Sequence, residues 1–214
     1  MIPKIIHQIH MGDNPLPEQE LYWQKTWIDK NPDWSHILWD DAKIKGDLKI
    51  THPQVFENCE SFSEKSDILR FEILYQFGGL YVDTDFECLK NIDPLFMNKS
   101  IVLYKQQRRK ICSAFFGATK GNTDVKRLID GLPGREKSHG NQNADAKYGP
   151  LYVTETLGHE VALPDGKGSK KKTVYPYLWM EKDRRTEDFT KTHPEAYAVH
   201  HWNHSWKLKS PKYL

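Results

Sequence analysis

The sequence, 214 residues long, contains few cysteines, no long apolar segment and almost no excess of either charge. Its three cysteines, Cys59, Cys88 and Cys112, are odd in number and lack the spacing of a metal site, so we expect a reducing compartment. The apolar start, residues 1–6, is too short for a signal peptide, and no later run is long enough to span a membrane. We therefore expect no membrane-spanning segment.

The charge balance argues against one class of partner. Lys and Arg number 31 and Asp and Glu number 29, a formal net charge of +2, whereas nucleic-acid-binding proteins usually carry a marked basic excess. Hydrophobic residues make up 38% and charged residues 28% of the chain, as in ordinary folded proteins. The length fits one domain, residues 1–214, with a substantial core.

The first forty residues are expected to alternate strand, helix and strand, as in an α/β unit. The strands are residues 4–9 and 35–39, and the intervening helix, residues 18–30, is ended by Pro32. Further strands are expected at residues 80–82, 101–104, 114–119 and 197–201, and a further helix at residues 123–132.

The clearest helix is residues 61–77, for which Ser63 is a candidate N-cap. Gly78-Gly79 ends this helix, because glycine readily adopts the left-handed backbone conformation. The strand at residues 80–82 follows at once and leads directly into Asp83-Thr84-Asp85.

Asp83 and Asp85 are the first candidates for a functional site. Positions i and i+2 of a regular strand point the same way, so both carboxylates could face one cavity at the carboxyl edge of the sheet. Two like charges held close repel each other, and a divalent cation relieves that repulsion. A cation held by so few protein groups keeps positions open for phosphate oxygens. The alternative is an ordinary turn or a solvated edge.

Two further groups of residues could complete such a site. Asp67 and Arg70 share a helical face, either as a surface ion pair or as groups that contact a sugar hydroxyl and a phosphate. Residues 200–206 contain three histidines and two tryptophans. An imidazole there could supply a third ligand, one that suits manganese better than magnesium, whereas the tryptophans could equally be core or lid residues.

Several segments resemble glycosyltransferase family 32, sugar transferases with an Asp-x-Asp motif that include yeast-type α-mannosyltransferases and are related to the clostridial glucosylating toxins. The resemblance is carried by residues 2–9, 31–40, 66–70, 78–85 and 199–206. It spans nearly the whole chain and is most specific in the central segments. It implies a GT-A fold, a Rossmann-like α/β domain whose mixed central sheet is flanked by helices.

The resemblance also implies roles for individual residues. Asp85 would bind the metal directly, Asp83 would contact the metal and the ribose, and His201 would be a further metal ligand. Arg70 would act with the metal to stabilise the leaving diphosphate. The residues implied in binding the donor nucleotide sugar are Ile9, His10, Asp67, Arg70, Tyr81, Asp83, His204 and Trp206.

The implied activity is metal-dependent transfer, with retention of anomeric configuration, of a hexose or deoxyhexose from a nucleoside-diphosphate sugar to a saccharide or glycoprotein glycan. The cation is Mn²⁺, with Mg²⁺ as the alternative. Relatives often carry a tryptophan that stacks on the base where this chain has His10, and an imidazole covers less area. The family resemblance at Ile9 still implies backbone contacts to a pyrimidine base. It therefore favours UDP, with GDP as the alternative.

Other activities stay open on the residues alone. A metal-dependent phosphoesterase also uses paired Asp and His, although a two-metal site normally needs more ligands. A non-catalytic sugar-binding module would account for the tryptophans, and a nucleic-acid binder is the least expected. We expect a monomeric, cytoplasmic protein of a bacterial or virus-infected cell, either complete or the catalytic domain of a longer chain.

Overall fold

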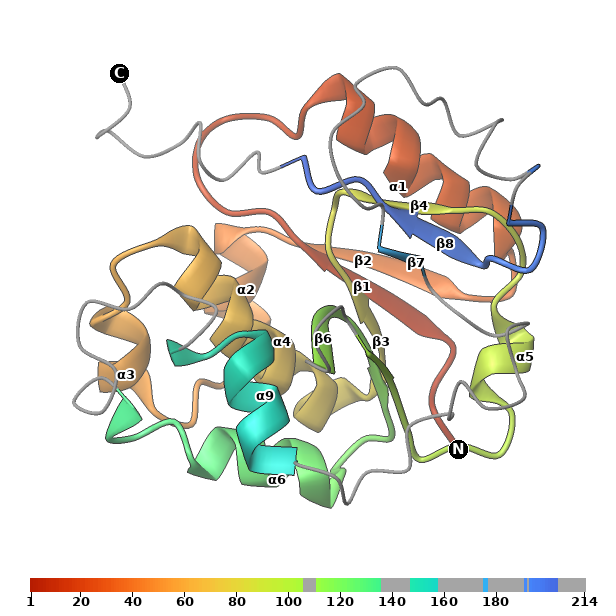
Figure 1. The fold of residues 1–214 in the computed structure, drawn as a ribbon. Coiled ribbons are helices and arrows are strands. Elements are labelled where there is room, and N and C mark those ends of the chain that lie inside the picture. Colours follow the sequence, from red (N-terminus) through yellow and green to blue (C-terminus); the bar gives the residue numbers. More distant parts are fainter. Residues whose placement is uncertain (106–110, 136–146, 158–174, 177–190, 192, 204–214) are drawn as a thin grey trace.

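The computed structural model describes residues 1–105, 111–135, 147–157, 175–176, 191 and 193–203. Within them the chain forms two sheets with helices packed around them (Figure 1). The elements are β1 (Ile5–Ile9), α1 (Glu18–Lys30), β2 (Ser35–Trp39), α2 (Asp41–Asp47), α3 (Pro53–Glu57), α4 (Phe62–Phe77), β3 (Gly79–Val82), β4 (Phe86–Cys88), α5 (Asp93–Phe96), β5 (Ile101–Lys105), β6 (Ile111–Ala118), α6 (Thr123–Asp130), α9 (Pro150–Leu157), β7 (Tyr175–Pro176) and β8 (Ala198–His200).

The larger sheet has five strands in the order β2-β1-β3-β6-β5. Strand β1 pairs in parallel with β2 and β3, whereas β6 pairs antiparallel with both β3 and β5. The predicted α/β class with a mixed central sheet is therefore confirmed. The smaller sheet has the order β4-β8-β7, in which β8 pairs antiparallel with β4 and parallel with β7.

Two apolar cores occupy opposite faces of the five-stranded sheet. Helices α4, α6 and α9 cover one face, and α1 lies on the other side together with β4 and β8 (Figure 1). Strand β3 shows the alternation that separates the cores, since Tyr81 belongs to the first and Leu80 and Val82 belong to the second. Strand β3 therefore contributes side chains to both cores.

Helix α4 begins and ends with local signals in the sequence. Its N-cap is Ser61, whose extended backbone lets the side chain accept from the amide of Glu64, and not Ser63 as predicted, because Ser63 already lies within the first turn. The predicted end at Gly78-Gly79 is confirmed, with φ angles of 68° and 103°. A Cβ atom on Gly79 would lie 2.5 Å from the carbonyl oxygen of Ile5, so glycine is required there.

His7 of β1 fastens the junction between α4 and β3. Its Nε2 lies 2.8 Å from the carbonyl oxygen of Gly78, and the indole of Trp39 donates to its Nδ1 at 3.1 Å. Because an indole N–H can only donate, Nδ1 is the acceptor and Nε2 carries the proton. Burial lowers the pKa of His7 to about 4, although the bond to Gly78 opposes this shift. The neutral imidazole is thus the form that fits the junction.

The predicted elements, the short strands β3 and β8 among them, lie close to their expected positions, whereas several other short elements were not predicted. The bounds of α1 and β2 agree with the prediction, whereas β6 begins three residues earlier than expected, at Ile111. Elements α2, α3, α5, α9 and β4 were not predicted, because segments of three to eight residues show little hydrophobic periodicity.

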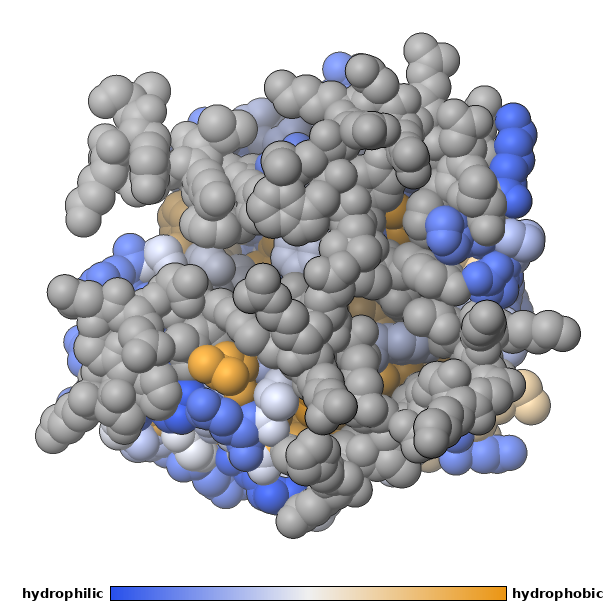
Figure 2. Space-filling view, in the orientation of Figure 1, coloured by the Kyte–Doolittle hydropathy of each residue, from blue (hydrophilic) through white to orange (hydrophobic). Residues whose placement is uncertain are grey.

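The described surface is mainly polar. In the orientation of Figure 1, hydrophilic side chains gather at the lower left and right edges of the molecule, and hydrophobic ones show only as small patches (Figure 2). Among the residues that the structure describes, no helix combines the length and the apolar character needed to cross a lipid bilayer.

Candidate metal and donor-binding site

Asp83-Thr84-Asp85 directly follows a strand, as predicted, but it forms a turn between β3 and β4 and does not continue the extended geometry on which the same-face expectation was based. Strand β3 ends at Val82, and the amide of Phe86 donates to the carbonyl oxygen of Asp83 at 3.2 Å, which closes the turn. The turn carries the chain from the five-stranded sheet to the three-stranded sheet. The same-face rule of a strand therefore does not apply, and each carboxylate is oriented by partners of its own.

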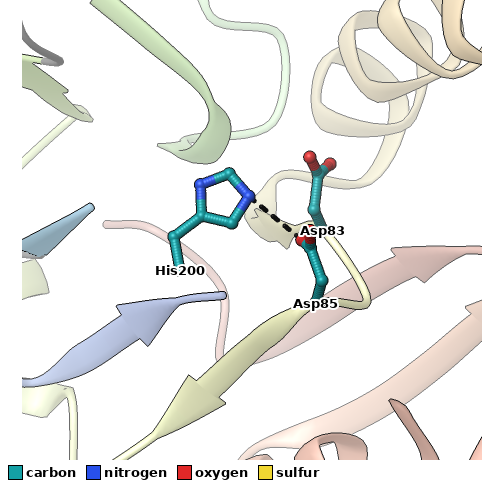
Figure 3. A group of neighbouring side chains, drawn as sticks. All are labelled: Asp83, Asp85 and His200. Carbon is teal, nitrogen blue, oxygen red and sulfur yellow. Dashed lines mark ion pairs between the residues drawn. The ribbon is translucent and has the colours of Figure 1, made fainter. Parts of the chain in front are cut away.

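The structure brings Asp83, Asp85 and His200 together. Each offers one ligand atom, and these atoms all lie within 4.8 Å of one another. The imidazole of His200 points toward the carboxylate of Asp85, with its Nε2 3.0 Å from Oδ1 (Figure 3). The His200 side chain is almost fully buried, whereas those of Asp83 and Asp85 are 30% and 15% exposed. The cluster is therefore partly open to solvent.

The donor atoms of this cluster fit a divalent cation. Among the described residues, Oδ1 of Asp85 and Nδ1 of His200 are buried without a hydrogen-bond partner, since the 3.0 Å contact has the distance of an ion pair but not the angle of a hydrogen bond. Two carboxylates and an imidazole form a ligand set suited to manganese-like ions. A cation among the three residues would satisfy Oδ1 of Asp85 and relieve the repulsion between the carboxylates.

His201, the predicted metal ligand, is directed elsewhere. Its Nε2 lies 2.9 Å from Oε2 of Glu87, and its ring stacks on Trp23 with centroids 4.2 Å apart and planes at 5°. Successive residues of an extended chain point to opposite sides, so His201 faces away when His200 faces Asp85. The structure thus places His200, and not His201, beside the two aspartates.

Arg70 and Tyr81 hold Asp83 in place. The Tyr81 hydroxyl donates to Oδ1 of Asp83 at 2.6 Å, and Nη2 of Arg70 lies 3.5 Å from the same oxygen. Nη1 of Arg70 donates to Oγ of Ser113 at 2.7 Å and pairs with Oδ1 of Asp67 at 3.0 Å, and the guanidinium lies over the Tyr81 ring. Both side chains of the Asp67–Arg70 pair are buried, so a surface ion pair is excluded.

The two aspartates differ in their electrostatic surroundings. Burial raises the pKa of Asp83, the Arg70 guanidinium lowers it and the Asp85 charge raises it again, with a net upward shift. Burial also raises the pKa of Asp85, but His200 and the backbone amide of Asn203 outweigh it, and the net shift is downward. Asp85 is thus the better-stabilised anion, and a cation would stabilise ionised Asp83 the most.

Of the predicted donor-binding residues, Ile9 and His10 lie at the carboxyl end of β1. Ile9 is buried in the core, and Nε2 of His10 is 2.8 Å from the carbonyl oxygen of Asn14. The neighbouring Gln8 was not singled out from the sequence, yet its Nε2 donates to the carbonyl oxygen of Asp83 at 3.3 Å. This contact joins the end of β1 to the Asp83-Thr84-Asp85 turn.

Two other residues of the site were missed in the sequence, Ser113 beside Arg70 and Asn203 beside Asp85. Ser113 belongs to no recognised motif, and Asn203 lies in the family-like segment 199–206 but was given no role there; only the pairing of distant segments brings them to the site. The predicted donor-binding residues His204 and Trp206 lie outside the described residues.

Residues 17–102, which include α4 and the Asp83-Thr84-Asp85 turn, match the family model described as "Glycosyltransferase sugar-binding region containing DXD motif". This part of the chain is similar to the DXD-motif glycosyltransferases. Inositol phosphoceramide mannosyltransferase 3 of Schizosaccharomyces pombe is 27% identical over 209 residues, which are 95% of this chain and 56% of that protein.

A second relative, mannosyl phosphorylinositol ceramide synthase CSH1 of Saccharomyces cerevisiae, is 37% identical over 98 residues, 44% of this chain and 26% of that protein. The chain thus spans about half the length, or less, of these family members. The solved structure of PaToxG glycosyltransferase superimposes with a TM-score of 0.58 at 22% identity, over 75% of this chain and 70% of that chain. This likeness confirms the expected GT-A fold.

Proposed function

We propose that the chain is the catalytic part of a glycosyltransferase that moves a hexose from a nucleoside-diphosphate sugar to a saccharide or glycan acceptor. One observation carries the proposal: Asp83, Asp85 and His200 lie within ligand distance of one another, at the turn where β3 ends. The match of residues 17–102 to the DXD-motif glycosyltransferase model supports sugar transfer at this turn. The imidazole favours Mn²⁺ as the cation, with Mg²⁺ as the alternative.

The protein's own contribution is to orient the ligands. Asp83, Asp85 and His200 would hold the cation, which when bound supplies positive charge against the negative charge of a departing diphosphate. The Tyr81 hydroxyl holds Oδ1 of Asp83, and the amide of Asn203 holds Oδ2 of Asp85. Because these hydrogen-bond donors already hold the carboxylates in place, the carboxylates need little rearrangement during the reaction.

We propose transfer with retention of configuration. The bond between the anomeric carbon and the diphosphate oxygen breaks while the acceptor oxygen bonds the same face of that carbon, and the acceptor proton passes to the departing diphosphate. This reaction needs no protein nucleophile. Burial raises the pKa of both Cys88 and Cys112 to about 12, so neither thiol is ionised near neutral pH.

The family resemblance at Ile9 favours a UDP-sugar as the donor, and a GDP-sugar is the alternative. The names of the relatives add mannose to the hexoses that should be tested. Phosphoester hydrolysis is the competing activity. Among the described residues, Asp83, Asp85 and His200 are the group of three that could hold one ion, whereas a two-metal phosphoesterase needs more ligands.

The test is a panel of UDP- and GDP-linked hexoses with Mn²⁺, Mg²⁺ or chelator, in which release of nucleotide and transfer to saccharide acceptors are measured. We expect one donor to be used with Mn²⁺ and none with chelator. Asp85→Asn should lower kcat/KM by about a thousandfold, because a cation supplies several kcal/mol and each 1.4 kcal/mol is tenfold.

Asp47→Asn is the matched control, because this exposed carboxylate pairs with the exposed Lys43 on α2, away from the proposed cation site. Its activity should equal that of the wild type. Cleavage of simple phosphate esters without sugar transfer would favour the phosphoesterase. Full activity of Asp85→Asn would refute the proposed role of the cluster.

A further inference from the structure

Asp85 presents its two carboxylate oxygens to different partners. Oδ1 lies 3.0 Å from Nε2 of His200, on the side of the proposed cation. Oδ2 accepts from the backbone amide of Asn203 at 3.0 Å. Because this amide engages one oxygen, it directs the other toward Asp83 and His200. The position of residue 203 therefore sets the orientation of Asp85.

The segment that carries this amide is not part of a regular strand. Strand β8 ends at His200, and Trp202 has a φ angle of 52°, in the left-handed region that a bulky side chain rarely adopts. A backbone held in such a conformation requires support from its surroundings. The backbone amide of His201 supplies one contact, to the carbonyl oxygen of Asp85 at 2.9 Å.

Helix α1 supplies further support through two side chains on one of its faces. Oε1 of Glu20 accepts from Nδ2 of Asn203 at 3.1 Å, and three residues later Trp23 stacks on His201. Glu20 is fully buried, and its Oε2 has no hydrogen-bond partner within the described part of the chain. A buried carboxylate satisfied on one oxygen is costly, so its retention calls for a functional reason.

We propose that Glu20 and Asn203 form a clasp that positions Asp85 and His200 for the divalent cation. The inference rests on the proposed cation site and adds two positioning residues to it, one from α1 and one from the end of β8. Neither acts on the sugar itself. The Glu20–Asn203 bond holds the backbone of residue 203 where its amide meets Oδ2 of Asp85, so the bond acts on the cation through Asp85.

The test measures Mn²⁺ binding to the protein alone, by the loss of the electron paramagnetic resonance signal of free Mn²⁺. Outer-shell partners of metal ligands typically contribute ten- to hundredfold in metal affinity. Glu20→Ala and Asn203→Ala should therefore each weaken Mn²⁺ binding by about tenfold or more. Glu20→Gln keeps an acceptor oxygen for Asn203 and should stay within about threefold of the wild type.

The double variant Glu20→Ala/Asn203→Ala should bind Mn²⁺ no more weakly than either single variant, because both remove the same bond. Asn203 is exposed, so its replacement leaves the core intact. Asn122→Ala, which removes the N-cap of α6, is the control for general destabilisation and should leave Mn²⁺ affinity unchanged.

The outcomes separate the clasp from the proposed function. If the wild type binds Mn²⁺ and Asp85→Asn does not, but Glu20→Ala and Asn203→Ala bind like the wild type, the clasp is wrong and the cation site stands. If Asn122→Ala loses as much affinity as the clasp variants, the effect is one of stability and the clasp is again wrong. If the wild type binds no Mn²⁺, the cation site itself fails.

Discussion

Asp83 and Asp85 are separated by one residue, yet they belong to two differently built regions. Asp83 directly follows β3 of the five-stranded sheet, and its partners Tyr81 and Arg70 precede it by 2 and 13 residues. Asp85 directly precedes β4 of the three-stranded sheet, and Asn203, which bonds its Oδ2, lies 118 residues away. The carboxylate of Asp83 is thus held by residues that are near it in the sequence, whereas the carboxylate of Asp85 is held by a residue that is distant in the sequence.

The two regions therefore differ in what completes them and in what they contribute to the protein. The surroundings of Asp83 are a network of charges and hydrogen bonds that is complete once α4, β3 and β6 pack together. The surroundings of Asp85 are complete only after β8 pairs with β4 and the segment after it docks on α1. We therefore expect the Asp83 region to dominate stability and the Asp85 region to respond more to the cation.

The largest expected effect is on stability, in a comparison of Arg70→Met with His200→Ala. Loss of Arg70 leaves the buried carboxylate of Asp67 without its positive partner, and breaking such a buried pair costs about 3–5 kcal/mol. Loss of His200 removes a ring that stacks on Phe86 and should cost about 1–2 kcal/mol. Urea unfolding at pH 7 with chelator present measures both.

Lys25→Met, which breaks an exposed ion pair on α1, is the control and should change the unfolding free energy by less than about 0.5 kcal/mol. Equal losses for Arg70→Met and His200→Ala would remove the distinction between the two regions.

The second effect is a pH dependence on the Asp83 side, where His7 holds the junction that leads into β3. The pKa of His7 is lowered from 6.5 to about 4 in the folded protein. The unfolded chain therefore binds the proton more readily, and the contribution of His7 to stability is full above pH 6.5 and is lost as the pH falls toward 4. Its upper limit is about 3 kcal/mol.

His7→Gln removes this titration. We expect the variant to be less stable than the wild type at pH 7 and the difference in unfolding free energy to shrink by about 2–3 kcal/mol by pH 4.5, as measured by urea unfolding at each pH. Parallel curves for the two proteins between pH 7 and 4.5 would show that His7 is not buried in its neutral form.

The third effect concerns dynamics and tests the Asp85 side directly. Without cation, the amide of Asn203 should exchange with solvent deuterium faster than the amide of Val82, because the first lies in a segment held by side chains and the second in a sheet. Mn²⁺ at about a hundred times its dissociation constant should slow exchange at Asn203 by up to about a hundredfold. Equal protection of both amides without cation would contradict the comparison.

The smallest effect concerns the N-cap of α4, the helix that carries Arg70. Ser61→Ala should lower the unfolding free energy by about 1 kcal/mol, because the amide of Glu64 loses its acceptor. Mn²⁺ affinity should not change, since Arg70 lies more than two turns further along the helix. Ser63→Ala is the matched control and should cost less than about 0.5 kcal/mol. A larger loss for Ser63→Ala would restore it as the cap.

Local chemistry explains why the Asp83 region was predictable. The helix over residues 61–77, its end at Gly78-Gly79 and the strand that follows are specified by hydrophobic periodicity and by glycine's access to positive φ. Asp67 and Arg70 were placed on one helical face by their spacing alone. Their burial was not predictable, because it depends on Ser113 and Tyr81, which arrive from other elements.

By itself, the sequence determined the α/β class, the long elements and the Asp-x-Asp motif at the end of β3, because these depend on neighbours along the chain. Only the tertiary structure decided that the motif is a turn and that His200 rather than His201 meets it. Adjacent residues of a strand face opposite sides, so the choice depends on the register of β8 against β4. That register is set by pairing between segments more than a hundred residues apart.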